Sequence, residues 1–206
     1  MRHFLYFTAV SAMMMLQLYQ YFSPSAICRN ANVTKEANCI MQQNESQMAE
    51  YIKIALLQMM RRKNFHQISI TELCKKAGVS RMSFYRSFGS KEDVLKKWCA
   101  EITDKFVAES GISYRDNPLR EYFATLFTHV LKYREMTFLL RRDGLLWIVK
   151  DDIDRVFFET YRDVYDEYKM HFITGGIFGA YRLWIENGLR ETPEDLAARL
   201  SEILEK

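Results

Sequence analysis

Apolar residues recur along most of the chain with the spacing of one helix face. The first regular stretch has apolar side chains three or four positions apart, at Ile52, Ala55, Leu56, Met59 and Met60. This spacing is typical of the buried side of an amphipathic helix. No segment shows the strict alternation of apolar and polar residues that indicates a half-buried strand. The pattern therefore predicts an all-α protein.

The same spacing, with the breaks between periodic stretches, predicts where the other helices lie. After a short helix at 70–77 and another that follows Ser80, we expect helices over about 91–109, 118–133, 135–149, 152–169, 170–187 and 193–205. The last of them has strong start signals, because Thr192 can cap it and Pro193 suits its first turn.

Polar caps and one glycine mark three successive helices in the first part of this pattern, of which the first two are short. Ser69 and Glu72 have the spacing of a capping box, which satisfies two backbone donors at a helix start. Gly78 is the residue type that tolerates a left-handed backbone at a helix end. Ser80 can cap the second helix and Ser90 the third. This order of signals indicates a helix-turn-helix, whose second helix enters the major groove of DNA.

Two further features of this stretch bear on its role. Phe84 and Phe88 stand four positions apart, so we expect them to anchor the second helix against its neighbours. Lys91 falls in the first turn of the third helix, where a cation works against the helix dipole. A nearby DNA phosphate would compensate for that cost.

Charge divides the chain in the same way. Residues 53–97 hold eleven Lys and Arg against three acidic residues, a balance of +8, while the whole chain carries +3. Residues 98–206 hold fifteen basic and twenty acidic residues. Positive charge confined to one short region indicates a module that faces a polyanion, joined to a body with a different task.

The basic stretch resembles the DNA-binding domain of the TetR/AcrR family of bacterial transcriptional regulators. The matching residues are Ser69, Ala77-Gly78-Val79-Ser80, Phe84-Tyr85-Arg86-Ser87-Phe88 and Ser90-Lys91-Glu92. The resemblance implies a helix-turn-helix domain over 47–97, followed by a helical-bundle domain over 98–206 that binds an effector and dimerises.

The resemblance also implies which residues contact double-stranded DNA. Tyr85 and Lys91 match residues that bind backbone phosphates, and Arg81, Met82 and Ser83 match residues that lie toward bases. The full set of expected DNA contacts is Ser69, Thr71, Ser80, Arg81, Met82, Ser83, Tyr85, Arg86 and Lys91. A purely structural role for the caps and the phenylalanines remains the alternative.

Aromatic residues are frequent after residue 98, and they have two interpretations. They could line a pocket for a small apolar effector, as the resemblance implies, or they could form an ordinary core. The candidates for pocket residues are Tyr122, Phe127, Trp147 and Phe158. Arg141-Arg142-Asp143 could hold an acidic ligand, although exposure to solvent is the simpler interpretation.

Glycines in the penultimate helix indicate close approach of another helix. Each costs about 1 kcal/mol against alanine within a helix, so close packing must compensate. The segment FITGGIFGAYRLWIENGLRETPEDLAARL resembles the paired helices through which TetR-like proteins form homodimers. The expected interface residues are Gly175, Gly176, Gly179, Trp184, Leu196, Leu200 and Leu204. A two-fold dimer would match a palindromic operator.

Other chemistry finds little support in the sequence. The four cysteines form no C-x-x-C pair, which favours reduced thiols, and no two histidines have the i, i+4 spacing of a zinc site. Nucleophile elbows, P-loops and dinucleotide fingerprints are missing. We therefore expect a protein that is not an enzyme and that uses no metal or cofactor.

The N-terminal stretch over 4–22 is apolar and uncharged, so it resembles a signal peptide or a membrane segment. A membrane tether and an extra helix packed on the body remain open. Because export would make a DNA-binding domain pointless, our preferred interpretation is a translation start at Met41 or Met48. Residues 1–46 are then an extension, and we expect a cytoplasmic protein without a membrane partner.

Together these features predict a homodimeric transcriptional regulator, most simply a repressor. Its C-terminal domain would receive a small-molecule effector, and the helix that starts at Lys91 would transmit the signal. The alternative is a DNA-bound adaptor whose C-terminal domain binds a protein. A cavity large enough for a ligand would favour the first hypothesis, and a filled core would favour the second.

Overall fold

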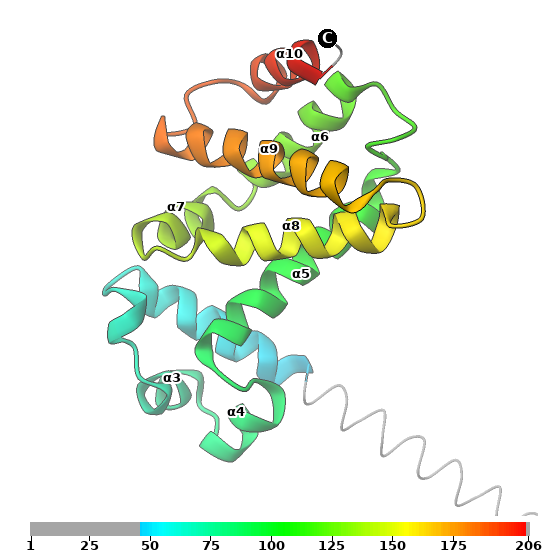
Figure 1. The fold of residues 1–206 in the computed structure, drawn as a ribbon. Coiled ribbons are helices and arrows are strands. Elements are labelled where there is room, and N and C mark those ends of the chain that lie inside the picture. The colour runs from blue at the N-terminus through cyan, green and yellow to red at the C-terminus, as the bar shows by residue number, and fades with distance from the viewer. Residues whose placement is uncertain (1–45, 205–206) are drawn as a thin grey trace, which may run out of the picture. The chain divides into compact units, whose positions relative to one another are not determined.

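The computed structural model describes residues 46–204, which form helices and turns without a strand (Figure 1). The prediction of an all-α protein is therefore confirmed for this part of the chain. A helix over residues 46–60 precedes η1 (Phe65–Gln67), α3 (Ile70–Ala77), α4 (Arg81–Ser87), α5 (Lys91–Ser110), α6 (Leu119–Leu131), α7 (Arg134–Arg142), α8 (Leu146–Tyr161), α9 (Glu167–Glu186) and α10 (Pro193–Leu204). The apolar stretch over 4–22 and Met41 lie outside the described residues. None of the described helices has the length and apolar character needed to cross a membrane.

Two helix boundaries differ from the prediction. The stretch over 135–149 forms two helices, α7 and α8, because Gly144 lies between them with a left-handed φ of 73°. The next break falls after α8, where the side chain of Asp166 caps α9 by accepting a hydrogen bond from the Lys169 N–H at 3.0 Å. A glycine and an aspartate cap, both visible in the sequence, were the signals for these breaks.

The first helices pack around an aromatic and aliphatic core of their own. Phe65, Leu73 and Phe84 are fully buried there, and Phe88 is 3% exposed. The predicted anchoring role of Phe84 and Phe88 is confirmed, with their ring centres 5.8 Å apart. Because α4 buries these phenylalanines, its remaining faces are left to present polar residues.

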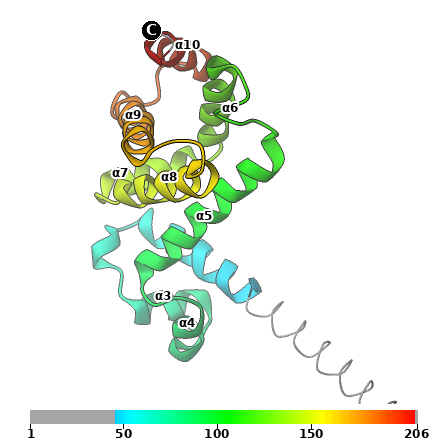
Figure 2. The same ribbon diagram turned by 45° about the vertical axis from the view of Figure 1, so that its right-hand side comes forward.

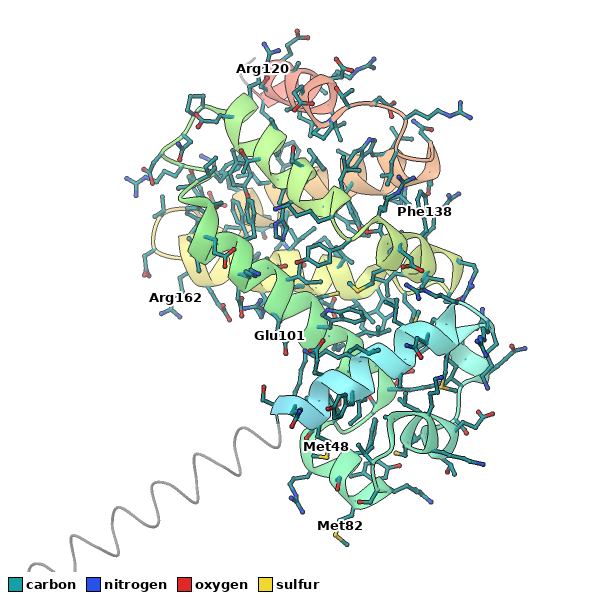
Figure 3. All side chains as sticks on the ribbon, turned by 180° about the vertical axis from the view of Figure 1, so that it is seen from behind. Met48, Met82, Glu101, Arg120, Phe138 and Arg162 are labelled. Atoms are coloured by element: carbon teal, nitrogen blue, oxygen red, sulfur yellow. The ribbon has the colours of Figure 1, made fainter. Side chains whose placement is uncertain are left out.

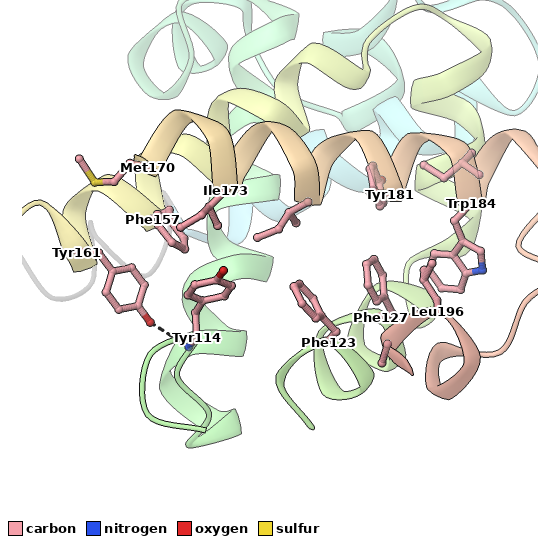
Figure 4. Packing of buried hydrophobic residues seen from close by; sticks show 13 residues of the cluster. Tyr114, Phe123, Phe127, Phe157, Tyr161, Met170, Ile173, Tyr181, Trp184 and Leu196 are labelled. Atoms are coloured by element: carbon pink, nitrogen blue, oxygen red, sulfur yellow. Dashed lines mark hydrogen bonds between the residues drawn. The ribbon is translucent and has the colours of Figure 1, made fainter. Parts of the chain in front are cut away.

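Helices α6, α8, α9 and α10 enclose a second, larger core (Figure 4). Phe127 packs edge-on against Trp184 with ring centres 5.2 Å apart, and the Trp184 indole donates a hydrogen bond to the Glu191 carbonyl at 2.9 Å. The Tyr161 hydroxyl accepts a hydrogen bond from the Tyr114 N–H at 3.0 Å. In Figures 1 and 2, α10 lies beside α6, and α9 lies beside α8.

Helix α5 belongs to both groups of helices. It runs without interruption from Lys91 to Ser110, so the predicted domain boundary at 97/98 falls inside it. Its first half buries Val94 and Leu95, and its second half buries Phe106. The division at this boundary stays a prediction, and α5 provides a continuous connection across it.

Candidate functional site

The start of α3 has the reciprocal hydrogen bonds of a capping box. The Ser69 hydroxyl accepts from the Glu72 N–H at 3.2 Å, while the Glu72 carboxylate accepts from the Ser69 N–H at 3.0 Å. A hydrogen bond from Lys63, followed by those from Ser69, lowers the pKa of Glu72 to about 2. Gly78 then ends the helix with a φ of 70°. The predicted cap and turn are thus confirmed.

Helix α4 begins after Ser80, whose hydroxyl accepts a hydrogen bond from the Ser83 N–H at 3.0 Å. The next residue, Arg81, is exposed. Met82 is 76% exposed and lies at the outer end of α4 in Figure 3. Tyr85 is 48% exposed, with the Arg81 guanidinium 6.0 Å from its ring centre. The first turn of α4 therefore faces solvent, opposite the buried Phe84.

Most of the predicted DNA contacts lie on the surface of this helix pair. The exposed ones are Ser69, Thr71, Ser80, Arg81, Met82, Tyr85 and Arg86. Ser83 and Lys91 are half-buried. Two further cations, Lys75 and Lys76, are exposed in the last turn of α3. On this surface, the first turn of α4 is accessible to base edges, and the nearby cations can pair with a phosphate backbone.

Lys91 has partners within its own chain. Its ammonium donates hydrogen bonds to the carbonyl oxygens of Phe65 and Ile68, each at 2.8 Å, and lies 4.4 Å from the centre of the Phe65 ring. The expectation that a phosphate compensates for its unfavourable helix position therefore needs correction, because these carbonyls supply the compensation. An ammonium has three donors, so one remains for a further acceptor.

A helix pair joined by a glycine turn, with an accessible second helix in a basic region, defines a helix-turn-helix DNA-binding protein. Comparison with known proteins agrees: residues 55–97 match the family described as "Bacterial regulatory proteins, tetR family", and residues 144–206 match a "Transcriptional regulator C-terminal region". The chain belongs to the TetR family of transcriptional regulators, which confirms the resemblance seen in its sequence. Members of this family are DNA-binding regulators.

One curated relative also matches over much of the chain. It is the uncharacterized HTH-type transcriptional regulator YxbF of Bacillus subtilis (strain 168), which is 23% identical over 154 residues. The match covers 70% of this chain and 40% of the relative. The match thus spans about two fifths of the length of this relative.

A cavity of about 110 Å³ lies among helices α5 to α9. Its walls are mostly apolar and are formed by Cys99, Ile102, Thr103, Phe106, Leu126, Phe127, His129, Val130, Tyr133, Met136, Thr137, Val149, Asp152, Ile153, Ile177 and Tyr181. Of the four predicted pocket residues, Phe127 alone is in these walls. The aromatic pattern could not identify the others, because a ring at helical spacing has the same signature in a core and in a pocket.

The other three predicted pocket residues have different surroundings. Tyr122 packs edge-on against Tyr114 with ring centres 5.4 Å apart, and burial raises the pKa of its hydroxyl. Trp147 is 42% exposed, and the Lys96 ammonium lies over its ring, 4.9 Å from the ring centre. Phe158 packs against His171 on α9, with ring centres 4.8 Å apart. These three residues therefore lie outside the walls of this cavity.

The polar groups of the cavity wall are largely paired. The Asp152 carboxylate accepts hydrogen bonds from the Thr103 hydroxyl at 2.6 Å and from the Arg155 guanidinium at 2.8 Å. The Tyr181 hydroxyl donates to Thr137 at 3.4 Å, and burial raises the pKa of Tyr181 to about 12. Burial likewise raises the pKa of the Cys99 thiol to about 12, which keeps it protonated.

Helix α9 has an exposed apolar face opposite its buried one. Tyr168 is 89% exposed, Phe172 is 75% exposed and Leu183 is 57% exposed. Gly176 and Gly179 are exposed between them, and a Cβ at either position would meet no atom within 4 Å apart from its chain neighbours and the nearby backbone of its own helix. This face could therefore accept another helix at close range.

The predicted interface residues divide between this face and the core. Trp184 is 1% exposed and Leu196 is 9% exposed, and both belong to the core of their own subunit. Their assignment to a dimer interface is corrected, because their apolar surface is already covered. Leu200 packs partly against the same core, and Leu204 is 36% exposed.

The end of α7 is bonded to the first helices. The buried Asp143 carboxylate accepts hydrogen bonds from the Phe65 N–H at 3.0 Å, the Asn64 amide at 2.9 Å and the Arg142 guanidinium at 2.8 Å. Arg142 also donates to the Met60 carbonyl at 2.7 Å. Burial alone would raise the pKa of Asp143, but the bonds from Arg142 and Phe65 hold it below its ordinary value. Neither solvent nor an acidic ligand is needed to explain this cluster, which sequence reasoning missed.

The cysteines and potential metal ligands of the described residues lie apart from one another. Within residues 46–204, no group of three or more His, Cys, Asp and Glu residues is arranged to hold a metal ion. Cys74 and Cys99 are free and buried. Cys28 and Cys39 lie outside the described residues.

Proposed function

We propose that the protein is a homodimeric repressor that binds a palindromic operator and is released by an effector bound in its C-terminal domain. One observation carries this proposal: α4 exposes Arg81 and Met82 in its first turn, within a region of charge +8. Homodimers and repressors are typical of the TetR family. The protein would act in the cytoplasm of its cell, where the DNA is.

The proposed DNA contacts follow from position. Arg81, Met82 and Ser83 face bases, because the first turn of a recognition helix reaches the major groove. The phosphate contacts come from Tyr85, Arg86 and the third donor of Lys91. Ser69, Thr71 and Ser80 add polar contacts at the helix starts.

The exposed face of α9 supports the proposed dimer. A second copy would cover Tyr168, Phe172 and Leu183, and the glycines Gly175, Gly176 and Gly179 would let the two helices approach closely. Leu200 and Leu204 of α10 would add to its edge. A two-fold axis through this face would present two copies of α4 to two half-sites.

The cavity of about 110 Å³ supports a small-molecule effector over a protein partner. Its walls include Met136 and Thr137 of α7, the helix whose end is bonded to Phe65 through Asp143. We propose α7, together with α5, as the link to the DNA-binding helices. An effector that prefers the released state by about 1.4 kcal/mol would weaken operator binding tenfold.

Sequencing of double-stranded fragments retained by the purified protein from a random pool tests the DNA-binding proposal. We expect a palindrome with half-sites about one helical turn apart. Arg81→Ala should change the enriched bases, whereas Arg120→Ala, at an exposed position on α6, should not. An unsymmetrical site would contradict the dimer, and a lack of enrichment would contradict specific binding.

A reporter gene under control of the enriched site tests the direction of regulation. Expression of the full chain should lower reporter output, because a repressor bound at a promoter blocks transcription. Higher output would show an activator instead.

A further inference from the structure

The size of the C-terminal cavity limits what it can hold. Its volume is about 110 Å³. Engineered cavities of about 150 Å³ in other proteins accommodate benzene. This cavity is smaller, so a single ring is the largest ligand body that it can take, and a fused polycyclic ligand would require the surrounding helices to move.

The walls of the cavity favour a neutral and mostly apolar ligand. Phe106, Phe127 and Met136 contribute rings and a flexible thioether, which suit an aromatic body. The acidic group in the wall is Asp152, and both of its oxygens already accept hydrogen bonds, from Thr103 and Arg155. An ion would enter this cavity without a partner of opposite charge and would lose its hydration.

One polar atom of the wall remains unsatisfied. The Nε2 atom of His129 is buried and has no hydrogen-bond partner among the described residues. Burial, followed by the charge of Lys132, lowers the pKa of His129, while a hydrogen bond to the Ile102 backbone raises it by less. The neutral ring therefore donates a hydrogen bond from its N–H to the Ile102 carbonyl, and Nε2 remains as an acceptor. A buried acceptor without a donor is unfavourable until a donor reaches it.

His129 also lies where a ligand would enter. Together with Phe106 it lines an open groove on the surface between α5 and α6, whose other walls include Ser110 and Thr128. The His129 and Phe106 rings are 5.1 Å apart. The two rings thus separate the groove from the cavity. Because Nε2 itself is closed to a water-sized molecule, a ligand must part the two rings as it passes between them, and its polar group then comes next to Nε2.

We propose that the cavity binds a neutral single-ring molecule with one hydrogen-bond donor, of the phenol class, and that His129 Nε2 accepts the hydrogen bond. This inference rests on the proposed effector function and gives it a chemical class. The ring of the ligand fills the apolar space, and its hydroxyl satisfies the atom that the protein leaves unpaired.

Calorimetric titration of the full chain with phenol and with toluene tests the proposal. The two molecules have nearly the same shape, but toluene lacks the donor. Phenol should bind about tenfold more tightly, because toluene leaves Nε2 unpaired. Equal affinity for both, tighter binding of toluene or no binding of phenol would overturn the proposal.

Variants of His129 locate the hydrogen bond. His129→Phe should bring the two affinities to within about threefold of each other, since it replaces the acceptor by an apolar ring. His171→Phe, which changes a histidine outside the cavity, should keep the tenfold preference. Retention of the preference in folded His129→Phe would exclude His129 as the acceptor.

A cavity-filling variant tests the location and does not depend on the folding of His129→Phe. Val149→Phe places a ring in the cavity wall and should abolish binding of both phenol and toluene while the thermal midpoint stays within a few degrees. Binding that survives in this variant would place the ligand elsewhere and overturn the proposal.

Operator binding measured with and without phenol separates this inference from the proposed function. Selective binding of phenol without release of DNA would support the ligand class and contradict the effector role. Specific DNA binding by a protein that takes up neither probe would contradict the ligand class alone. Phenol-selective binding by a protein without a specific DNA site would contradict the regulator alone.

Discussion

The exposed surface of α4 and that of α9 differ in chemistry. Helix α4 exposes Arg81 and Tyr85 in a strongly basic region, whereas α9 exposes Tyr168, Phe172 and Leu183. A charged surface is stable in water without a partner, so it suits a partner that binds and leaves. A stripe of large apolar side chains is typical of a surface that stays covered. This difference supports the proposed partners, which are DNA for the first surface and a second copy of the chain for the other.

The largest effect should come from a charge on the apolar surface. Leu183→Glu would bury two unpaired carboxylates in a symmetric interface, so the dimer should dissociate and operator affinity should fall about 100-fold or more. Val107→Glu, at another exposed apolar position, 48% exposed on α5, is the matched control. Sedimentation measures the dissociation, fluorescence anisotropy measures the operator affinity, and circular dichroism checks that both variants are folded. A folded Leu183→Glu dimer would place the interface elsewhere.

The next largest effect should come from the hydrogen bonds that join Asp143, at the end of α7, to Asn64 and Phe65. Asp143→Ala leaves the Phe65 N–H and the Asn64 amide without their acceptor, which should cost about 2–4 kcal/mol of unfolding free energy. Asp163→Ala removes a carboxylate that is 92% exposed and should have almost no effect. Chemical denaturation measures both. Equal stability of the two variants would mean that the Asp143 bonds contribute little.

The same contact predicts a pH dependence. Because the pKa of Asp143 is lowered in the folded protein, its stabilisation is complete above the ordinary carboxyl pKa of about 4. It is lost as the pH falls through the folded pKa, since protonation then removes the charge. Stability should therefore decline less steeply in acid for Asp143→Ala than for the unaltered chain.

Lys91 lies between the basic surface and the core, so it could stabilise the fold, contact DNA, or do both. Lys91→Ala removes two hydrogen bonds to carbonyl oxygens, so it should lower the unfolding free energy by about 1–3 kcal/mol. Lys75→Ala removes the same charge from an exposed position and should leave stability nearly unchanged. If Lys91 also contacts a phosphate, Lys91→Ala should reduce the salt slope of DNA binding by about one. An unchanged slope with lowered stability would make Lys91 purely structural.

The sequence predicted best what local chemistry determines. The Ser69 cap, the Gly78 turn and the buried Phe84 depend on neighbouring residues, and the structure has each of them. The partners of long-range contacts were not predictable in this way. Lys91 and Asp143 bond to backbone atoms 23 to 78 residues away, and no periodic pattern encodes such pairs.

The C-terminal aromatic residues show the same limit. Trp184 and Leu183 are adjacent, yet one is buried in the core and the other is 57% exposed. Helical periodicity identifies two apolar faces on α9 without saying which one its own subunit covers. The exposed face became visible only when the packing of α9 against α8 was known.

The smallest effect concerns the hydroxyl of Tyr85 on the basic surface. If this hydroxyl donates to a phosphate, Tyr85→Phe should weaken binding about threefold to tenfold, because it removes one hydrogen bond and keeps the ring. The loss should be equal for the operator and a scrambled duplex, since phosphates carry no sequence information. Tyr168→Phe, at the most exposed tyrosine of α9, should leave DNA affinity unchanged because that ring lies on the apolar surface. Fluorescence anisotropy with both duplexes measures the ratio, and a change confined to the operator would assign Tyr85 to base recognition.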